Sequence, residues 1–136
     1  MCIRDRKRVS IADILVMNPK MIIFDEPTAA LDPINAENLE NVLQKLCGEG
    51  MTITLSTHDV DFAYRWAERI IVFSDGEIIG DDTPENIFRD KELLNRANLK
   101  VPSVFTIYEA LKARGILKDR GVCPRDVESL EKLIME

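Results

Sequence analysis

Two adjacent acidic residues, Asp25 and Glu26, directly follow the apolar run Met21 to Phe24. Such a run is typical of a strand buried in a parallel sheet, and these sheets bind ligands at the carboxyl ends of their strands. There, one carboxylate can hold Mg²⁺ through water, the metal bridging nucleotide phosphates, while its neighbour orients or deprotonates an attacking water. Two solvated acids at a strand end leading into a turn would give the same pattern, so the pair alone does not decide.

The single histidine of the chain lies at the end of the next apolar segment, in Ser56-Thr57-His58-Asp59. The carboxyl ends of neighbouring parallel strands meet at one edge of a sheet, so we expect His58 to approach the same phosphate as the acidic pair. A lone histidine is more often a surface residue or a satisfied core residue. Its place at a strand end, together with the neighbouring acids, favours a functional role here.

Helix, strand, helix, strand and helix alternate before and after these residues, and this order indicates an α/β fold with a parallel sheet. A β-hairpin and further helices are expected after it. Pro33, Thr83-Pro84 and Ser103 are the expected helix starts, and Gly48, Gly50 and Gly115 the expected helix ends. By periodicity we expect helices at 7–17, from Pro33 to about 48 with a buried stripe of Leu39, Val42, Leu43 and Leu46, and at 59–67, 90–98, 103–114 and 125–135; strands are expected at 21–24, 51–56, 70–73 and 77–80.

The composition is that of an ordinary folded protein, with 136 residues, 46% apolar and 31% charged. Apolar runs are strand-sized, so no membrane helix is predicted. A net charge of -6 argues against a nucleic-acid surface as the main function of the chain. Three widely spaced cysteines favour neither a disulfide framework nor a zinc site, and they suggest a reduced cytosolic setting.

At three ordered segments the sequence resembles the ATP-binding-cassette (ABC) ATPases, which have a P-loop NTPase fold. Asp25-Glu26-Pro27-Thr28 resembles the end of their Walker B strand, Ala30-Leu31-Asp32 their D-loop, and Ser56 to Asp59 their switch-histidine segment. The resemblance covers residues 7 to about 98. Trp66-Ala67 and Leu99-Lys100-Val101-Pro102 are similar to the cobalt/nickel branch of the energy-coupling-factor importers. Tyr64 and Trp66 themselves are expected to pack in a core or interface.

The resemblance implies a role for each matching residue. Asp25 would belong to the water-mediated Mg²⁺ shell and Glu26 would be the catalytic carboxylate. His58 would contact the γ-phosphate of ATP, and Asp32 would take part in cross-talk between two subunits. The implied cofactors are ATP and Mg²⁺.

The departures from the family pattern concern the first part of the domain. No G-x-x-x-x-G-K-[ST] motif, which cradles nucleotide phosphates, occurs in the sequence. The family's glutamine-bearing loop is also missing, and Met1 to Asp5 stands where the family signature Leu-Ser-Gly-Gly-Gln is expected. We therefore expect residues 1–6 to be foreign, residues 7–98 to be the C-terminal part of an ABC nucleotide-binding domain, and residues 99–136 to be a helical extension.

The resemblance implies a fragment of the ATP-hydrolysing subunit of an energy-coupling-factor importer for cobalt or nickel ions, inactive alone. It implies a second ATPase subunit and integral membrane subunits as partners, no nucleic acid, and a peripheral place at the cytoplasmic face of the membrane. Two alternatives stay open: a non-catalytic regulatory or interaction module of the same fold, and an ABC ATPase with a role outside transport. Neither the transported solute nor the choice between homodimer and heterodimer can be read from these residues, and the role of residues 99–136 stays open as well.

Overall fold

The computed structural model describes residues 13, 16–117 and 121–135. The chain divides into two compact units, Met1–His58 and Asp59–Glu136. The expected foreign segment at residues 1–6 lies outside the described residues, as does nearly all of the helix expected at 7–17. Within the described part of the chain, no helix combines the length and apolar character needed to span a membrane.

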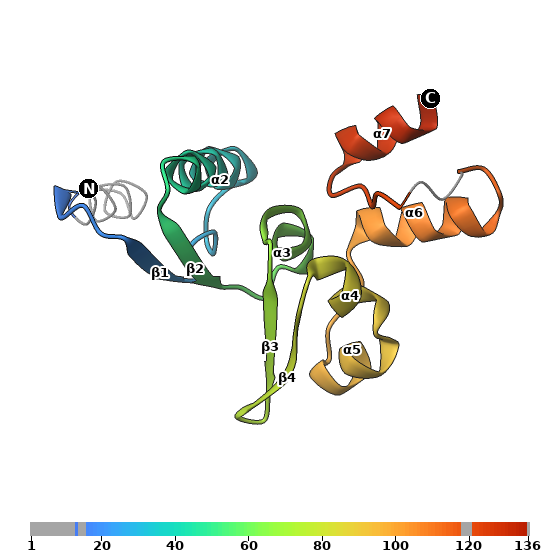
Figure 1. Ribbon diagram of the computed structural model, residues 1–136, viewed down its shortest axis with the longest axis horizontal. Coiled ribbons are helices and arrows are strands. Elements are labelled where there is room, and N and C mark those ends of the chain that lie inside the picture. The colour runs from blue at the N-terminus through green and yellow to red at the C-terminus, as the bar shows by residue number, and fades with distance from the viewer. Residues whose placement is uncertain (1–12, 14–15, 118–120, 136) are drawn as a thin grey trace. The chain divides into compact units, whose positions relative to one another are not determined.

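The first unit is a strand–helix–strand arrangement (Figure 1). Strand β1 (Met21–Asp25) and strand β2 (Thr52–Ser56) pair in parallel, with Ile22 opposite Ile53 and Asp25 opposite Ser56. Helix α2 (Pro33–Gly48) is the connection that two parallel strands require. The predicted α/β class and parallel pairing are confirmed, and the carboxyl ends of β1 and β2 lie next to each other.

Helix α2 begins and ends where its sequence predicts. Asp32 is its N-cap and accepts a hydrogen bond from the Asn35 amide at 3.0 Å, while Pro33 occupies the first turn. Leu43 and Leu46 are buried, as expected, but Val42 is 44% exposed. Val42 lies at the edge of the apolar stripe, and the described sheet under α2 has only two strands, so it covers only the middle of that stripe.

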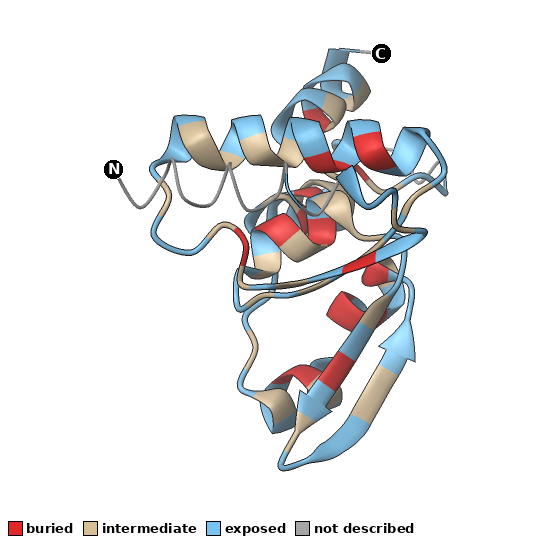
Figure 2. Ribbon diagram, turned by 90° about the vertical axis from the view of Figure 1, so that its left-hand side faces the viewer, coloured by how far each residue is buried: buried red, intermediate tan, exposed pale blue. Residues whose placement is uncertain are grey.

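The prediction that β1 is buried on both faces is wrong for this chain. Ile22 is buried, whereas Ile23, which points to the opposite face, is 72% exposed. Figure 2 shows the ribbon coloured by burial class. Successive side chains of a strand alternate between faces, and α2 covers one of them. In the described residues nothing covers the other face, so half of the apolar run is open to solvent.

In its described residues, the second unit begins with α3 (Val60–Trp66), followed by a hairpin and four further helices. The hairpin strands are antiparallel, with Asp75 and Gly76 at φ 52° and 81° in the turn, as the sequence predicts. The helix predicted to start at Thr83-Pro84 is present, with Thr83 as its N-cap. The elements after α3 are β3 (Ile70–Ser74), β4 (Glu77–Asp82), α4 (Pro84–Arg89), α5 (Lys91–Ala97), α6 (Ser103–Ala113) and α7 (Val127–Met135).

An aromatic core holds this unit together. Tyr64 of α3 packs edge-on against Phe88 of α4 and Phe105 of α6, with ring centroids 5.8 and 5.6 Å apart. Leu94 of α5 completes the buried cluster. Tyr64 is 1% exposed, which confirms the expected packing role, and the half-buried Trp66 stacks on Phe62. Burial raises the pKa of the Tyr64 hydroxyl, so this side chain is neutral at any physiological pH.

The described residues after position 98, 99–117 and 121–135, pack within the second unit. The predicted cap of α6 is wrong, because Pro102 is the N-cap and makes no side-chain bond. Ser103 instead donates its backbone N–H to Asp61 Oδ1 of α3 at 2.7 Å. Contacts therefore cross position 98/99, while the expected domain boundary there stays a prediction.

Candidate functional site

Asp25 and Ser56 are direct partners at the carboxyl ends of β1 and β2. The Ser56 hydroxyl donates a hydrogen bond to Asp25 Oδ1 at 2.5 Å. Both residues are exposed, so the Asp25 carboxylate is oriented by the neighbouring strand and still reaches solvent. A carboxylate fixed at one oxygen has fewer rotamers to lose when it binds a ligand.

Glu26 follows with an uncommon backbone conformation, φ 44°. A non-glycine residue with positive φ is strained, at a cost of about 1–3 kcal/mol, and persists only where neighbouring contacts hold it. Here the Glu26 amide lies 3.1 Å from the Ser56 carbonyl oxygen and 3.2 Å from Ser56 Oγ. Strand β2 therefore fixes the point at which the chain turns out of β1.

His58 meets Glu26 beyond the strand ends. The distance between His58 Nε2 and Glu26 Oε1 is 3.4 Å; the His58 side chain is 97% exposed, whereas that of Glu26 is 32% exposed. The structure thus brings together the carboxylate and the imidazole that the sequence placed on neighbouring strands. The Glu26 carboxylate can accept a proton, and the His58 imidazole can donate a hydrogen bond to a substrate oxygen.

A tight turn separates this pair from Asp32. The Ala29 amide donates to the Glu26 carbonyl at 3.1 Å, and Ala30 has φ 62°. Both carboxylate oxygens of Asp32 bond to Asn35, one to its amide and one to its side chain. In this chain Asp32 therefore caps α2, and its expected role between subunits stays a prediction.

The donors at this site fit Mg²⁺ as part of its ligand shell. Mg²⁺ keeps several waters and takes one or two carboxylates together with substrate phosphates. Asp25 offers one oriented, exposed carboxylate of this kind. The described residues contain no cluster of three or more acidic, histidine or cysteine side chains that could hold a metal ion by themselves. Such a site therefore needs phosphate and water oxygens to complete it.

Comparisons with known proteins point to one kind of domain. The chain is 47% identical over 130 residues to the energy-coupling factor transporter ATP-binding protein EcfA2 of Methanospirillum hungatei, covering 96% of the chain but 32% of that protein. It is similar in structure to cbiO1 of Clostridium perfringens, part of the ABC transporter complex cbiONQ, with a TM-score of 0.60, 35% identity, and coverage of 80% of this chain and 44% of that one. No family model matches the sequence.

A third match comes from a dimeric ATP-binding cassette in a post-hydrolysis state with ADP and phosphate bound. Its TM-score is 0.56 at 38% identity, over 62% of this chain and 36% of that one. The chain is homologous to part of an ABC-type ATPase domain. It spans about a third of the first relative's length, and it matches the C-terminal part of such proteins.

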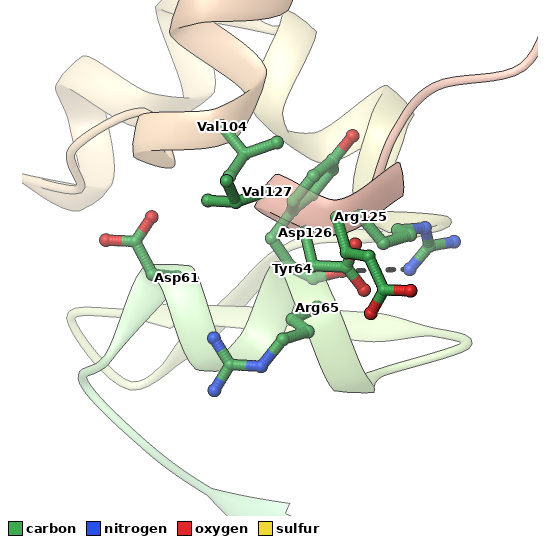
Figure 3. Close-up of a pocket in the computed structure, with 8 residues that line it drawn as sticks. Asp61, Tyr64, Arg65, Val104, Arg125, Asp126 and Val127 are labelled. Atoms are coloured by element: carbon green, nitrogen blue, oxygen red, sulfur yellow. Dashed lines mark hydrogen bonds between the residues drawn. The ribbon is translucent and has the colours of Figure 1, made fainter. Parts of the chain in front are cut away.

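A second polar cluster lies within the second unit. Arg125 donates from Nη1 to the carbonyl oxygens of Tyr64 and Ala67 at 2.9 and 2.8 Å, and its Nε lies 2.8 Å from Glu85 Oε1. Figure 3 shows Arg125 beside Tyr64. Its guanidinium carbon also lies 5.5 Å from the centre of the Tyr64 ring. Arg125 thereby caps the carboxyl end of α3 and joins it to α4.

A pocket of about 360 Å³ lies beside this cluster, between α3 and the first residues of α6 and α7 (Figure 3). Its charged groups are engaged with the protein, since Asp61 accepts from Ser103 and Asp126 accepts from the Ser129 amide at 2.7 Å. That amide, and then the Ser129 hydroxyl, holds the pKa of Asp126 below its ordinary value. The pocket is therefore a gap between packed helices, and the acidic groups that line it bond to the protein itself.

Sequence reasoning identified the acidic pair and the histidine but missed Ser56 and Arg125. Ser56 stood inside a motif segment, and strand register was the signal that could have paired it with Asp25. Arg125 offered no local signal, because its partners Tyr64, Ala67 and Glu85 are remote in the sequence.

Proposed function

We propose that this chain supplies the water-activating and metal-binding carboxylates of the ATP-hydrolysing subunit of an energy-coupling-factor importer. The observation that carries the proposal is the 3.4 Å approach of Glu26 and His58 at the ends of two paired parallel strands. Homology to an energy-coupling factor transporter ATP-binding protein supports it.

Each residue has one task in this proposal. Glu26 orients the attacking water and accepts its proton, which contributes roughly 10²- to 10⁴-fold to the rate. His58, with an accessible imidazole, hydrogen-bonds the γ-phosphate of ATP. Asp25 holds a water of the Mg²⁺ shell, and Asp32 faces a second subunit. Bound Mg²⁺ supplies charge neutralisation at the phosphates.

The proposal extends to assembly and cargo. The subunit pairs with a second ATPase subunit, works with integral membrane subunits, and lies peripherally at the cytoplasmic face of the membrane. The dimeric cassette and the membership of cbiO1 in a transporter complex support this assignment. Cobalt or nickel is the proposed cargo, on the resemblance of Trp66-Ala67 and Leu99 to Pro102. Uptake of radioactive cobalt and nickel by cells with and without the parent gene tests the cargo.

The catalytic proposal is tested by joining the chain, from residue 7, to an upstream segment that carries the phosphate-binding loop and the signature. In this completed protein Glu26→Gln keeps the shape of the side chain but cannot accept a proton. We expect ATP hydrolysis to fall by about 10²-fold or more while ATP binding persists. Asp25→Asn instead raises the Mg²⁺ concentration needed for half-maximal hydrolysis, because it alters the metal shell.

Glu49→Gln is the matched control, because it makes the same chemical change at a residue away from the carboxyl ends of β1 and β2. Glu49 is exposed at the end of α2. Hydrolysis by this variant should equal that of the parent. Full activity in Glu26→Gln would reject the role of Glu26.

A further inference from the structure

One hydroxyl group, that of Ser56, contacts both residues of the acidic pair. Ser56 Oγ donates to Asp25 Oδ1 at 2.5 Å and lies 3.2 Å from the Glu26 amide nitrogen, from which it accepts. A hydroxyl has one proton to donate and lone pairs with which to accept, so it can make both bonds at once. Donation to a carboxylate is a charge-assisted bond, stronger than one between neutral groups.

The two bonds act on different parts of the pair. The first fixes the Asp25 carboxylate by one oxygen. The second helps to hold the Glu26 backbone at φ 44°. In this backbone conformation the Glu26 side chain contacts His58. The register of the parallel strands, in which Asp25 and Ser56 are opposite each other, puts the hydroxyl in place.

We propose that Ser56 is a positioning residue for the Asp25–Glu26 pair. Its hydroxyl fixes the side-chain carboxylate of Asp25, and it positions the carboxylate of Glu26 by holding the Glu26 backbone amide. The proposal deepens the proposed ATPase function and rests on it for its catalytic consequence. The positioning itself is a property of the strand ends and can be measured without ATP.

The first experiment measures the positioning directly in the 136-residue chain. Hydrogen exchange followed by mass spectrometry, in dilute solution, reports the protection of peptides that contain Glu26. Ser56→Ala removes one of the two acceptors of the Glu26 amide, so exchange there should rise by about 2- to 10-fold. Ser56→Thr keeps the hydroxyl and should restore parent protection.

Thr54→Ala is the matched control, because Thr54 is an exposed hydroxyl residue on the same face of β2, two positions before Ser56. Exchange at Glu26 should not change in this variant. Peptides from α6, in the second unit, show in every variant whether the rest of the chain stays folded. Unchanged exchange at Glu26 in Ser56→Ala, or equal acceleration in Thr54→Ala, overturns the proposal.

The second experiment measures the catalytic consequence in the completed protein. In Ser56→Ala we expect a fall in kcat of about 10-fold and a rise in the Mg²⁺ concentration for half-maximal hydrolysis, because both carboxylates lose their alignment. The affinity for ATP in the absence of Mg²⁺ should be unchanged, and Ser56→Thr should restore kcat. A purely structural role would lower kcat and metal-free ATP affinity together, and that result rejects positioning.

The two experiments separate the two claims. If the completed protein with its native residues hydrolyses no ATP, the proposed function fails, and hydrogen exchange still decides the role of Ser56. If hydrolysis is normal and depends on Glu26 but not on Ser56, the positioning proposal fails alone.

Discussion

At the scale of single residues, the unusual feature is a glutamate with positive φ immediately after a strand. Glu26, with φ 44°, and Ala30, with φ 62°, both lie in the segment that joins β1 to α2. Neither residue type favours this region, so the conformation is imposed by contacts and not by local preference. Strain of this kind is common at functional sites, and at Glu26 it coincides with the approach to His58.

His58→Ala tests the imidazole that contacts Glu26. In the completed protein this variant should lower kcat by about 10²-fold, the usual cost of removing one donor to a developing anionic oxygen. ATP affinity should change little, because the phosphate-binding loop is untouched. Steady-state hydrolysis and calorimetric titration with ATP measure the two quantities. Thr52→Ala, an exposed change at the far end of β2, is the control, and a His58→Ala variant within about twofold of the parent would exclude contact with the γ-phosphate.

At the scale of elements, α3 is held at both ends by residues from the last third of the chain. Near its start Asp61 accepts a hydrogen bond from Ser103 of α6, and at its end Arg125 donates to the Tyr64 and Ala67 carbonyl oxygens. Orphan carbonyl groups at a helix end need such partners. The last third of the chain is therefore part of what gives α3 its stability.

Arg125→Met tests this connection. It removes two hydrogen bonds from a charged donor and the pair with Glu85, so we expect the free energy of unfolding to fall by about 2–3 kcal/mol. Urea unfolding followed by the fluorescence of Trp66, the single tryptophan of the chain, reports the second unit directly.

Lys132→Met is the control for Arg125→Met. Lys132 pairs with Glu128 at 2.9 Å, much like Arg125 with Glu85 at 2.8 Å. The side chains of Lys132 and Glu128, however, are both more than two-thirds exposed. Such an i,i+4 pair contributes only about 0.2–0.5 kcal/mol. If the two variants lose equal stability, Arg125 has no special place in holding α3.

At the scale of the whole molecule, the chain carries the carboxylates that we propose for catalysis but no sequence motif that binds nucleotide phosphates. No G-x-x-x-x-G-K-[ST] occurs in its sequence, and its net charge is -6. Exposed carboxylates repel polyphosphate unless cations and amide dipoles offset them. We expect the 136-residue chain to show no ATP binding by calorimetry up to millimolar ATP·Mg²⁺ and no turnover, whereas the completed protein binds. Micromolar affinity in the chain alone would contradict this.

The open face of β1 has a consequence in solution. Ile23, 72% exposed, and Met21, 51% exposed, lie on the same face of a two-stranded sheet. An uncovered apolar sheet surface promotes association, so we expect the chain to bind a hydrophobic dye and to aggregate as its concentration rises. Dye fluorescence and light scattering measure both effects.

Ile23→Lys should lower dye binding and aggregation while the helical circular dichroism stays unchanged, because it places a charge on the exposed face. Ile22→Lys, at the neighbouring buried position, should instead unfold the first unit. A sharp two-state melt of a monomer that binds no dye would refute the expectation.

The sequence by itself determined the elements and the order of the chemical groups. Period-2 and period-3.6 patterns, Pro33 and Thr83 at helix starts, and Asp75-Gly76 in the hairpin turn are local signals, and local signals are what a sequence displays directly. The parallel pairing of β1 and β2 followed from the strand–helix–strand order, and with it the meeting of Glu26 and His58 at one sheet edge.

Tertiary structure decided those contacts between remote residues that the order of the elements does not predict. Three features need contacts between segments far apart in the chain. They are the register that pairs Asp25 with Ser56, the positive φ of Glu26, and the hydrogen bonds of Arg125 to the end of α3. The exposure of Ile23 depends on which neighbours cover β1, and an apolar residue has the same sequence signature whether it is covered or open. Periodicity assigns a residue to a face of its element, but only packing decides what lies against that face.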